Sequence, residues 1–462
     1  MRMLKNAILG AILAFFTLFL ISRTLFAPSD VPKLPEIWWK PGNEKMVDQK
    51  IRPFNVTFSK KMIEDLKVRL KNTRELQPPL ANVGSTYGAN NVYLPMLLDH
   101  WLNKYDFAKQ ERLLNRYPHF ITNIQGLNVH YVHVKAKNAG EKRVLPLLLM
   151  HGWPGSFVEF NKIIPYLTTP RDNQDFVFEV IVPSLPGYAY SDASTIPGLS
   201  HVHVGILMKN LMLRLGFKQF YVQGGDWGGF ISNIMSAMFP QHVLGMHSNM
   251  CLSMLPYTWL KTLLFSFFPS LIVSKENYHL MYPASSHIAK KIVHSGYFHI
   301  QATRPDTIGV ALSDSPAGLA AWIIDKFVTG TSFIDKKTWE GGLFEKYTID
   351  EIIDNFMMYW ATNSITTAMR LYAESANYKS LIELAPQHWL VKVPSACAQF
   401  PNEVVYQPES LLRDYYVNLV RLTQMPRGGH FAAMEEPKLL ADDIWESVEV
   451  MEFHRKEKSP DL

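Results

Sequence analysis

The chain has 462 residues, 47% of them apolar and 19% charged, so it is long enough for two or three domains' worth of packed core. Its net charge of +5 comes from scattered Lys and Arg residues without a basic stripe, which argues against nucleic-acid binding. Cys251 and Cys397 lie far apart and form no CxxC pair, so we expect two separate buried thiols in a reducing compartment. No acidic cluster suits a metal, and we expect neither a metal nor a cofactor.

The first residues of the chain have the character of a membrane segment. Residues 7–21 carry no charge, and the apolar stretch continues to Phe26, which gives about 20 residues, close to the length that spans a bilayer. A cleaved signal peptide is the alternative, but Leu25 stands where the cut prefers a small residue. We therefore expect residues 1–26 to be a retained anchor, with an interfacial helix as a further alternative. The flanking positive charges nearly balance and leave the orientation open, although the scarcity of cysteines favours a cytosolic catalytic domain.

Two further segments precede the main part of the chain. Residues 27–50 contain four prolines and the pair Trp38-Trp39, so we expect an extended linker on the globular part or at the membrane interface. Residues 51–117 have apolar residues at helical spacing, for example from Leu94 to Leu102. They predict a helical accessory segment that carries no chemistry.

From residue 118 onward, short apolar strands alternate with helices. The runs at 121–124 and 127–134 predict two strands joined by a tight turn at Gln125-Gly126. Further strands are predicted at residues 145–150, 178–182, 220–223, 391–398 and 419–422, with a helix at 205–215. This alternation predicts a mostly parallel sheet with helices on both faces and with ligands at the carboxyl ends of its strands.

A helical stretch rich in Phe, Tyr, Trp and Met, residues 253–385, interrupts the alternation. Helices inserted into a sheet commonly cover an active site, so we expect this stretch to be a lid. The predicted fold is therefore an α/β core, residues 118–252 and 386–462, with a helical lid, the helical segment before it and the N-terminal anchor.

Asp226, in the sequence GGDWGG, is the strongest sign of chemistry. A nucleophile at a sharp strand-to-helix turn needs small residues two positions before and after it, and Gly224 and Gly228 meet this need. A carboxylate at such a turn forms an alkyl ester with a carbon electrophile, whereas a serine forms an acyl-enzyme. The plainer alternative is an aspartate that caps the following helix.

The sequence HGWPGS follows a predicted strand and supplies a partner for this turn. The backbone N–H of Trp153 can pair with that of Trp227 as an oxyanion hole, in which each donor contributes roughly 100-fold to 1,000-fold in rate. The bond before Pro154 is a candidate cis peptide. Ser156 and Glu159 fit a capping box that starts the next helix. An ordinary strand-to-helix turn is the alternative.

His430, in the sequence RGGHF, follows the last predicted strand. A catalytic base occupies this place when the chain order is nucleophile, acid and histidine. The acid that orients the base should stand at the end of the preceding strand. There the sequence FPNE makes Glu403 the candidate, and Glu409 is the fallback.

The sequences HGWPGS, GGDWGG, FPNE and RGGHFAAMEEP, in this order, resemble the microsomal epoxide hydrolase family, which has the α/β-hydrolase fold. The resemblance covers essentially the whole chain after residue 35. IRPF at residues 51–54 and LMLRLGF at 211–217 resemble the insect branch, the juvenile hormone epoxide hydrolases. Gly229 is a departure, since relatives often have serine there, but both residues are small.

The resemblance implies roles for residues that spacing alone does not identify. Tyr297 and Tyr372 would donate to the epoxide oxygen, which a phenol with a pKa of about 10 can do without ionising at rest. Which of them delivers the proton stays open. Asp226 would attack the epoxide, and His430 would activate the water that releases the diol.

The resemblance also implies an ether-bond hydrolase of the endoplasmic reticulum membrane that acts on a lipophilic epoxide, either juvenile hormone or a xenobiotic. A haloalkane dehalogenase is the nearest rival, because it uses the same aspartate ester with halide-binding donors in place of the tyrosines. A hydrolase fold without activity that serves as a membrane-bound binder is the alternative outside the enzymes.

Overall fold

The computed structural model describes residues 27–42, 48–331 and 342–458, together with residues 10, 17, 20 and 21. Most of the expected anchor, residues 1–26, therefore lies outside the described residues. Within the described part, no single helix is long and apolar enough to cross a membrane. Two consecutive helices, α11 (Pro305–Asp314) and α12 (Pro316–Thr331), have the required length and composition only when taken together, and they are bent by 119°.

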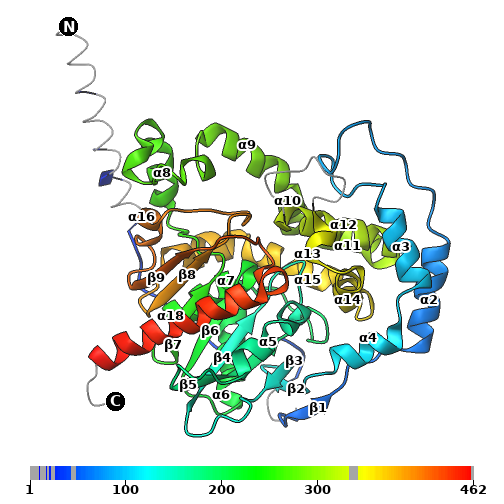
Figure 1. The fold of residues 1–462 in the computed structure, drawn as a ribbon, viewed down its shortest axis with the longest axis horizontal. Coiled ribbons are helices and arrows are strands. Elements are labelled where there is room, and N and C mark those ends of the chain that lie inside the picture. Colours follow the sequence, from blue (N-terminus) through cyan, green and yellow to red (C-terminus); the bar gives the residue numbers. More distant parts are fainter. Residues whose placement is uncertain are drawn as a thin grey trace.

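Nine strands within the described residues form one sheet at the centre of the molecule, in the order β1-β2-β3-β5-β4-β6-β7-β8-β9 (Figure 1). They are β1 (Arg52–Phe54), β2 (His119–Ile124), β3 (Leu127–Val134), β4 (Arg143–Met150), β5 (Phe176–Pro183), β6 (Phe220–Gly224), β7 (Val243–Ser248), β8 (Ser395–Gln399) and β9 (Leu419–Gln424). The pairs from β1 to β5 are antiparallel, and those from β5 to β9 are parallel. The predicted α/β class with a mostly parallel sheet is confirmed.

Local sequence explains most of these strands. The predicted hairpin is present, with Ile124 opposite Leu127 and Gln125 in the left-handed region at φ 51°. The central strands are buried on both faces, which is why they appear as continuous apolar runs. Two strands were not predicted. β1 begins a segment that was expected to be helical throughout, and β7 contains Gly245 and His247, which weaken its strand pattern.

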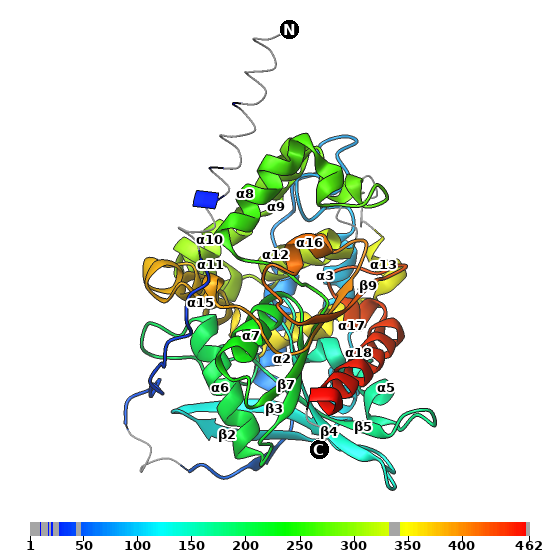
Figure 2. The same cartoon turned by 90° about the vertical axis from the view of Figure 1, so that its left-hand side faces the viewer.

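Helices cover both faces of the sheet, as Figure 2 shows. On one face α6 (His201–Arg214) packs against α7 (Asp226–Met238), and on the other α5 (Ile164–Thr168) packs against α18 (Pro437–Lys458). Short helices connect them: η2 (Phe157–Asn161), α16 (Glu409–Leu412) and α17 (Ala432–Glu435). Trp445 of α18 anchors its helix on the sheet, because its ring lies 5.1 Å from the ring of Phe176 and 4.7 Å from that of Phe178.

The chain between β7 and β8 is helical and lies over the carboxyl ends of the parallel strands (Figures 1 and 2). Besides α11 and α12 it contains α8 (Pro256–Leu264), η3 (Phe265–Phe267), η4 (Pro269–Leu271), η5 (Tyr278–Leu280), α9 (Ala284–His294), α10 (Gly296–Thr303), α13 (Leu343–Lys346), α14 (Ile349–Trp360), α15 (Ile365–Ser375), η6 (Lys379–Leu384) and η7 (Pro386–His388). We call this chain the helical insertion. It places aromatic side chains above the ends of β4 and β6.

The segment before the hairpin supports this insertion. Its helices are α2 (Lys60–Lys71), α3 (Leu94–Asn103) and α4 (Phe107–Leu114), and both α2 and α3 contact α12. The Tyr105 hydroxyl donates to Asp354 of α14 over 2.6 Å. Further upstream, the linker lies on the globular part, because Trp39 is buried and its backbone N–H donates to the carbonyl of Gln125.

Cys251 and Cys397 form a disulfide, so the prediction of two separate thiols was wrong. The parallel pairing of β7 with β8 places Ser248 opposite Cys397, and Cys251 follows closely after Ser248. Sheet register therefore joins two cysteines that are 146 residues apart in sequence. Disulfides are typical of oxidising compartments. Cysteine content consequently gives no support to a cytosolic catalytic domain.

Candidate active site

Asp226 lies at the turn between β6 and α7, with φ at 48° in the left-handed region that non-glycine residues rarely adopt. The two neighbouring glycines make this turn possible. A Cβ on Gly224 would lie 2.4 Å from the carbonyl carbon of Gly228, and a Cβ on Gly228 would lie 1.9 Å from the carbonyl oxygen of Met150. Gly225, rather than Asp226, occupies the cap position of α7. The capping alternative for Asp226 was therefore wrong, and its carboxylate is available for chemistry.

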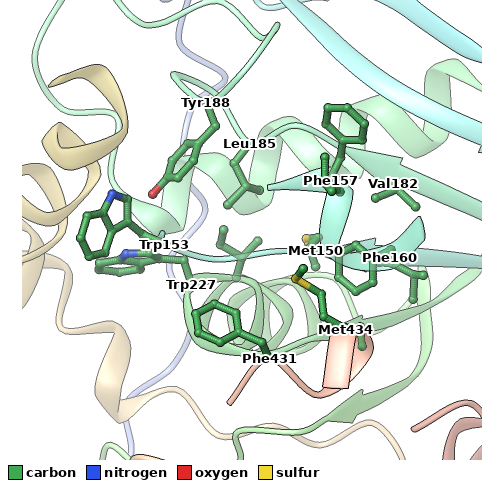
Figure 3. Close-up of a cluster of buried hydrophobic side chains, with 14 of the residues drawn as sticks. Met150, Trp153, Phe157, Phe160, Val182, Leu185, Tyr188, Trp227, Phe431 and Met434 are labelled. Atoms are coloured by element: carbon green, nitrogen blue, oxygen red, sulfur yellow. The ribbon is translucent and has the colours of Figure 1, made fainter. Parts of the chain in front are cut away.

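Trp153 provides a backbone donor beside this carboxylate. Its N–H donates to Oδ1 of Asp226 over 2.9 Å, and the bond to Pro154 is cis, as the sequence suggested. Trp227 follows Asp226 in the first turn of α7, and Figure 3 shows its indole beside that of Trp153. The sequence predicts the backbone N–H of Trp227 as the second donor of the oxyanion hole, and this role stays a prediction.

His430 contacts both carboxylates that the sequence assigned to it. Its Nδ1 lies 2.7 Å from Oε1 of Glu403, and its Nε2 lies 3.6 Å from Oδ2 of Asp226. Burial opposes protonation of the imidazole, but the charges of Glu403 and Asp226 raise the pKa of His430 well above its usual value. The fallback acid, Glu409, lies on α16, where it pairs with Arg413 instead.

Tyr297 of α10 and Tyr372 of α15 extend from the helical insertion toward the same place. Their ring centroids are 6.1 Å apart. Tyr297 stacks on Trp153 with the centroids 5.3 Å apart, and Tyr372 meets Trp227 edge-on at 4.8 Å. Burial, together with the negative charge of Asp226, raises the pKa of both phenols above their usual value. Both phenols are therefore neutral at physiological pH and still carry their protons.

Two residues near Asp226, the buried Tyr188 and the partly buried Glu159, were not assigned to the site from the sequence. Tyr188 follows β5, and burial and the charge of Asp226 raise its pKa; in Figure 3 its hydroxyl points toward Trp153. The sequence pattern predicts only a capping role for Glu159 of η2, but this residue lines a cavity together with Asp226 and His430. The rule that sites form at the carboxyl ends of strands could have identified Tyr188, because it stands in the loop after β5.

The fold, with Asp226, His430 and Glu403 gathered at one site, is that of an α/β hydrolase. A family model described as the epoxide hydrolase N terminus matches residues 51–160, and one described as the α/β hydrolase fold matches residues 146–268. The chain is 49% identical over 427 residues to juvenile hormone epoxide hydrolase 1 of Ctenocephalides felis, with 92% of each chain covered. It is 41% identical over 458 residues to epoxide hydrolase 1 of Oryctolagus cuniculus, which covers 97% of this chain and 100% of that relative.

A solved structure agrees with these sequence relatives. The crystal structure of juvenile hormone epoxide hydrolase from the silkworm Bombyx mori has a TM-score of 0.89 and 44% sequence identity, with 91% of this chain and 99% of that chain covered. The chain belongs to the epoxide hydrolase family, and its insect relatives of that family include the juvenile hormone epoxide hydrolases.

Proposed function

We propose that the protein hydrolyses lipophilic epoxides to diols through a covalent ester on Asp226. One observation carries the proposal: the carboxylate at the strand-to-helix turn faces a site in which Tyr297 and Tyr372 pack on Trp153 and Trp227. A nucleophile and two neutral proton donors are the groups that an epoxide requires for opening. Turnover of an epoxide by the purified protein, lost in Asp226→Asn, tests the proposal.

In the first half-reaction, a carboxylate oxygen of Asp226 attacks an epoxide carbon. The bond between that carbon and the ring oxygen breaks, and its electron pair goes to the oxygen. Tyr297 or Tyr372 gives its proton to this oxygen and becomes a phenolate. The product is a hydroxyalkyl ester of Asp226. No base is needed to activate the nucleophile, because a carboxylate is already ionised.

In the second half-reaction, neutral His430 takes one proton from a water molecule whose oxygen bonds to the carboxyl carbon of Asp226. The Trp153 N–H, and in our proposal the Trp227 N–H, stabilise the resulting oxyanion. The acyl bond to the alkoxide then breaks. The alkoxide takes the proton held by His430 and leaves as the diol, while the other water proton passes to the phenolate. Asp226 is again a carboxylate.

The ester also prepares the base for its task. Both Glu403 and Asp226 raise the pKa of His430 in the resting site. Ester formation removes the charge of Asp226 but leaves that of Glu403, so the imidazole loses its proton more readily after the first half-reaction than before it. The geometry thus supports a base that becomes active once its ester substrate exists.

The substrate is proposed from the relatives and from the lining of the site. Relatives named as juvenile hormone epoxide hydrolases and as epoxide hydrolase 1 suggest two substrate classes, juvenile hormone and xenobiotic epoxides. The aromatic lining suits either class, because both are lipophilic. Comparison of kcat/KM on a juvenile hormone and on a small aromatic epoxide decides between them. Diol without released halide separates either activity from that of a haloalkane dehalogenase.

We also propose that residues 7–26 tether the protein to the endoplasmic reticulum membrane. The apolar run, which carries no charge from residue 7 to residue 21, supports this proposal. Deletion of residues 7–26 should release an enzyme that still hydrolyses a soluble epoxide. Loss of all activity in a folded truncation would contradict a role limited to tethering.

The cytosolic placement of the catalytic domain stays a prediction, and the disulfide is evidence against it. Protease protection and thiol labelling in sealed microsomes test it.

A further inference from the structure

A small cavity adjoins the nucleophile and the base. It offers about 20 Å³ to water, enough for about one molecule. Its polar lining comes from Asp226, His430, Glu159 and Asn249, and neither Tyr297 nor Tyr372 contributes to it. The cavity therefore gives access to the carboxyl group of Asp226 away from the two tyrosines.

Glu159 is held firmly in this lining. The residue is partly buried, and its carboxyl group accepts hydrogen bonds from the backbone N–H groups of Gly152 and Ser156. The side chain of Glu159 occupies the space beside Gly155. Only a glycine fits at position 155, because a Cβ there would lie 1.4 Å from Oε1 of Glu159. The predicted capping box accounts for the bond from Ser156 but not for the one from Gly152. The second bond brings the carboxyl group to the loop that carries the Trp153 donor.

We propose that this cavity binds the hydrolytic water and that Glu159 is the positioning residue that holds it for His430. The inference rests on the proposed function, since only an ester on Asp226 needs such a water. The water must reach Nε2 of His430 with one hydrogen and the carboxyl carbon of Asp226 with its oxygen. An acceptor for its second hydrogen fixes its orientation, and the carboxyl group of Glu159 has lone pairs left for that purpose.

The charges around Glu159 fit this role. Burial, with the negative charge of Asp226 adding to it, raises the pKa of Glu159 to about 8, while the charge of His430 acts in the opposite direction. Ester formation removes the charge of Asp226, and loss of the proton from His430 removes the charge that acts against it, so these two effects on the pKa of Glu159 oppose each other. In either protonation state the carboxyl group keeps a lone pair that can accept a hydrogen from the water.

Glu159→Gln tests the inference in single-turnover experiments that follow the ester and the diol separately. Gln keeps the size of the side chain, but it replaces one carboxyl oxygen with an NH2 group that donates rather than accepts. We expect ester formation at nearly the wild-type rate and ester hydrolysis about 100-fold slower, so that the ester accumulates. Ala433→Val provides a second variant, because Ala433 lines the same cavity and added methyl groups would displace the water. It should slow the same half-reaction.

Glu435→Gln is the matched control. Glu435 is also a buried carboxyl group near His430, and burial raises its pKa to about 7, but it does not line the cavity. Its replacement should leave the ratio of the two rate constants near that of the wild type. Wild-type ester hydrolysis in Glu159→Gln would overturn the inference, as would equal slowing of both half-reactions or an equal effect of Glu435→Gln. If no variant, His430→Gln included, forms an ester, the proposed function itself fails.

Discussion

Nε2 of His430 lies 3.6 Å from Oδ2 of Asp226, a distance that is too long for a strong hydrogen bond. In a serine hydrolase the base must contact the nucleophile closely, because it removes the proton of the nucleophile. A carboxylate nucleophile has no proton to lose. The wider separation therefore fits a histidine that acts on water in the second half-reaction only. In this account Asp226 and the two tyrosines form the ester, and His430 hydrolyses it.

Replacement of the base should trap the intermediate. In His430→Gln we expect Asp226 to be alkylated at a rate close to that of the wild type, because the first half-reaction does not use His430. Mass spectrometry of the peptide that contains Asp226 should find a stable adduct with the mass of the substrate. Asp226→Asn is the control and should stay unmodified. An unmodified His430→Gln protein would show that the base is needed for both half-reactions.

Glu403 should set the pH dependence of ester hydrolysis. Its carboxylate raises the pKa of His430, and the base works only when it is neutral, so hydrolysis should increase with pH through that pKa. Glu403→Gln removes the charge and lowers the pKa of His430. The acid limb of the hydrolysis rate should then move to lower pH, while the plateau falls about 100-fold because the ring loses its orientation. An acid limb at an unchanged pH would contradict this coupling.

The two tyrosines should affect the opposite half-reaction. Tyr297→Phe and Tyr372→Phe should each slow ester formation by about 100-fold, and the double variant should form no detectable ester, because the alkoxide then lacks a proton donor. Stopped-flow quenching of the fluorescence of Trp153 and Trp227 can follow this step, since both indoles contact the tyrosines. Tyr188→Phe, a buried tyrosine outside the helical insertion, is the comparison. If Tyr297→Phe or Tyr372→Phe slowed only the hydrolysis of the ester and not its formation, the assigned role of that tyrosine would be refuted.

Asp354 should make the stability of the protein depend on pH. Burial raises its pKa to about 7, while the hydrogen bond from Tyr105 acts in the opposite direction. The folded state therefore holds this proton more tightly than the unfolded state does. The resulting stability is present below about pH 4 and is lost as the pH rises through about 7, by up to about 4 kcal/mol. Asp354→Asn should flatten the free energy of unfolding between pH 5 and pH 8. An unchanged slope would refute this assignment.

The sequence identified the parts of the site that depend on local structure. Asp226 stood out because a left-handed turn packed on β4 tolerates only glycine at positions 224 and 228, and that constraint is visible in six consecutive letters. Glu403 followed from the chain order of strand ends. These predictions needed the alternation of strands and helices but no knowledge of how distant elements pack.

Features that arise from packing between distant elements were missed or misread. The disulfide of Cys251 depends on the register of β7 against β8, which sequence separation does not reveal. Glu159 appeared as a helix cap, because its second bond, from Gly152, exists only once the loop after β4 folds back on η2. Tyr297 and Tyr372 were recognised through family resemblance alone, since two helices of the insertion must be placed before their rings can be known to meet.

The source of the diol oxygen tests the central claim most directly. If water attacks the carboxyl carbon of Asp226, the oxygen given to the first diol comes from the carboxylate and not from the solvent. We therefore predict that one turnover in water enriched in heavy oxygen, with the enzyme in excess over the epoxide, yields unlabelled diol and a labelled peptide that contains Asp226. Later turnovers should release labelled diol as the marked carboxylate is consumed. Labelled diol in the first turnover, with an unlabelled Asp226 peptide, would mean that water attacks the epoxide directly and would contradict the ester mechanism.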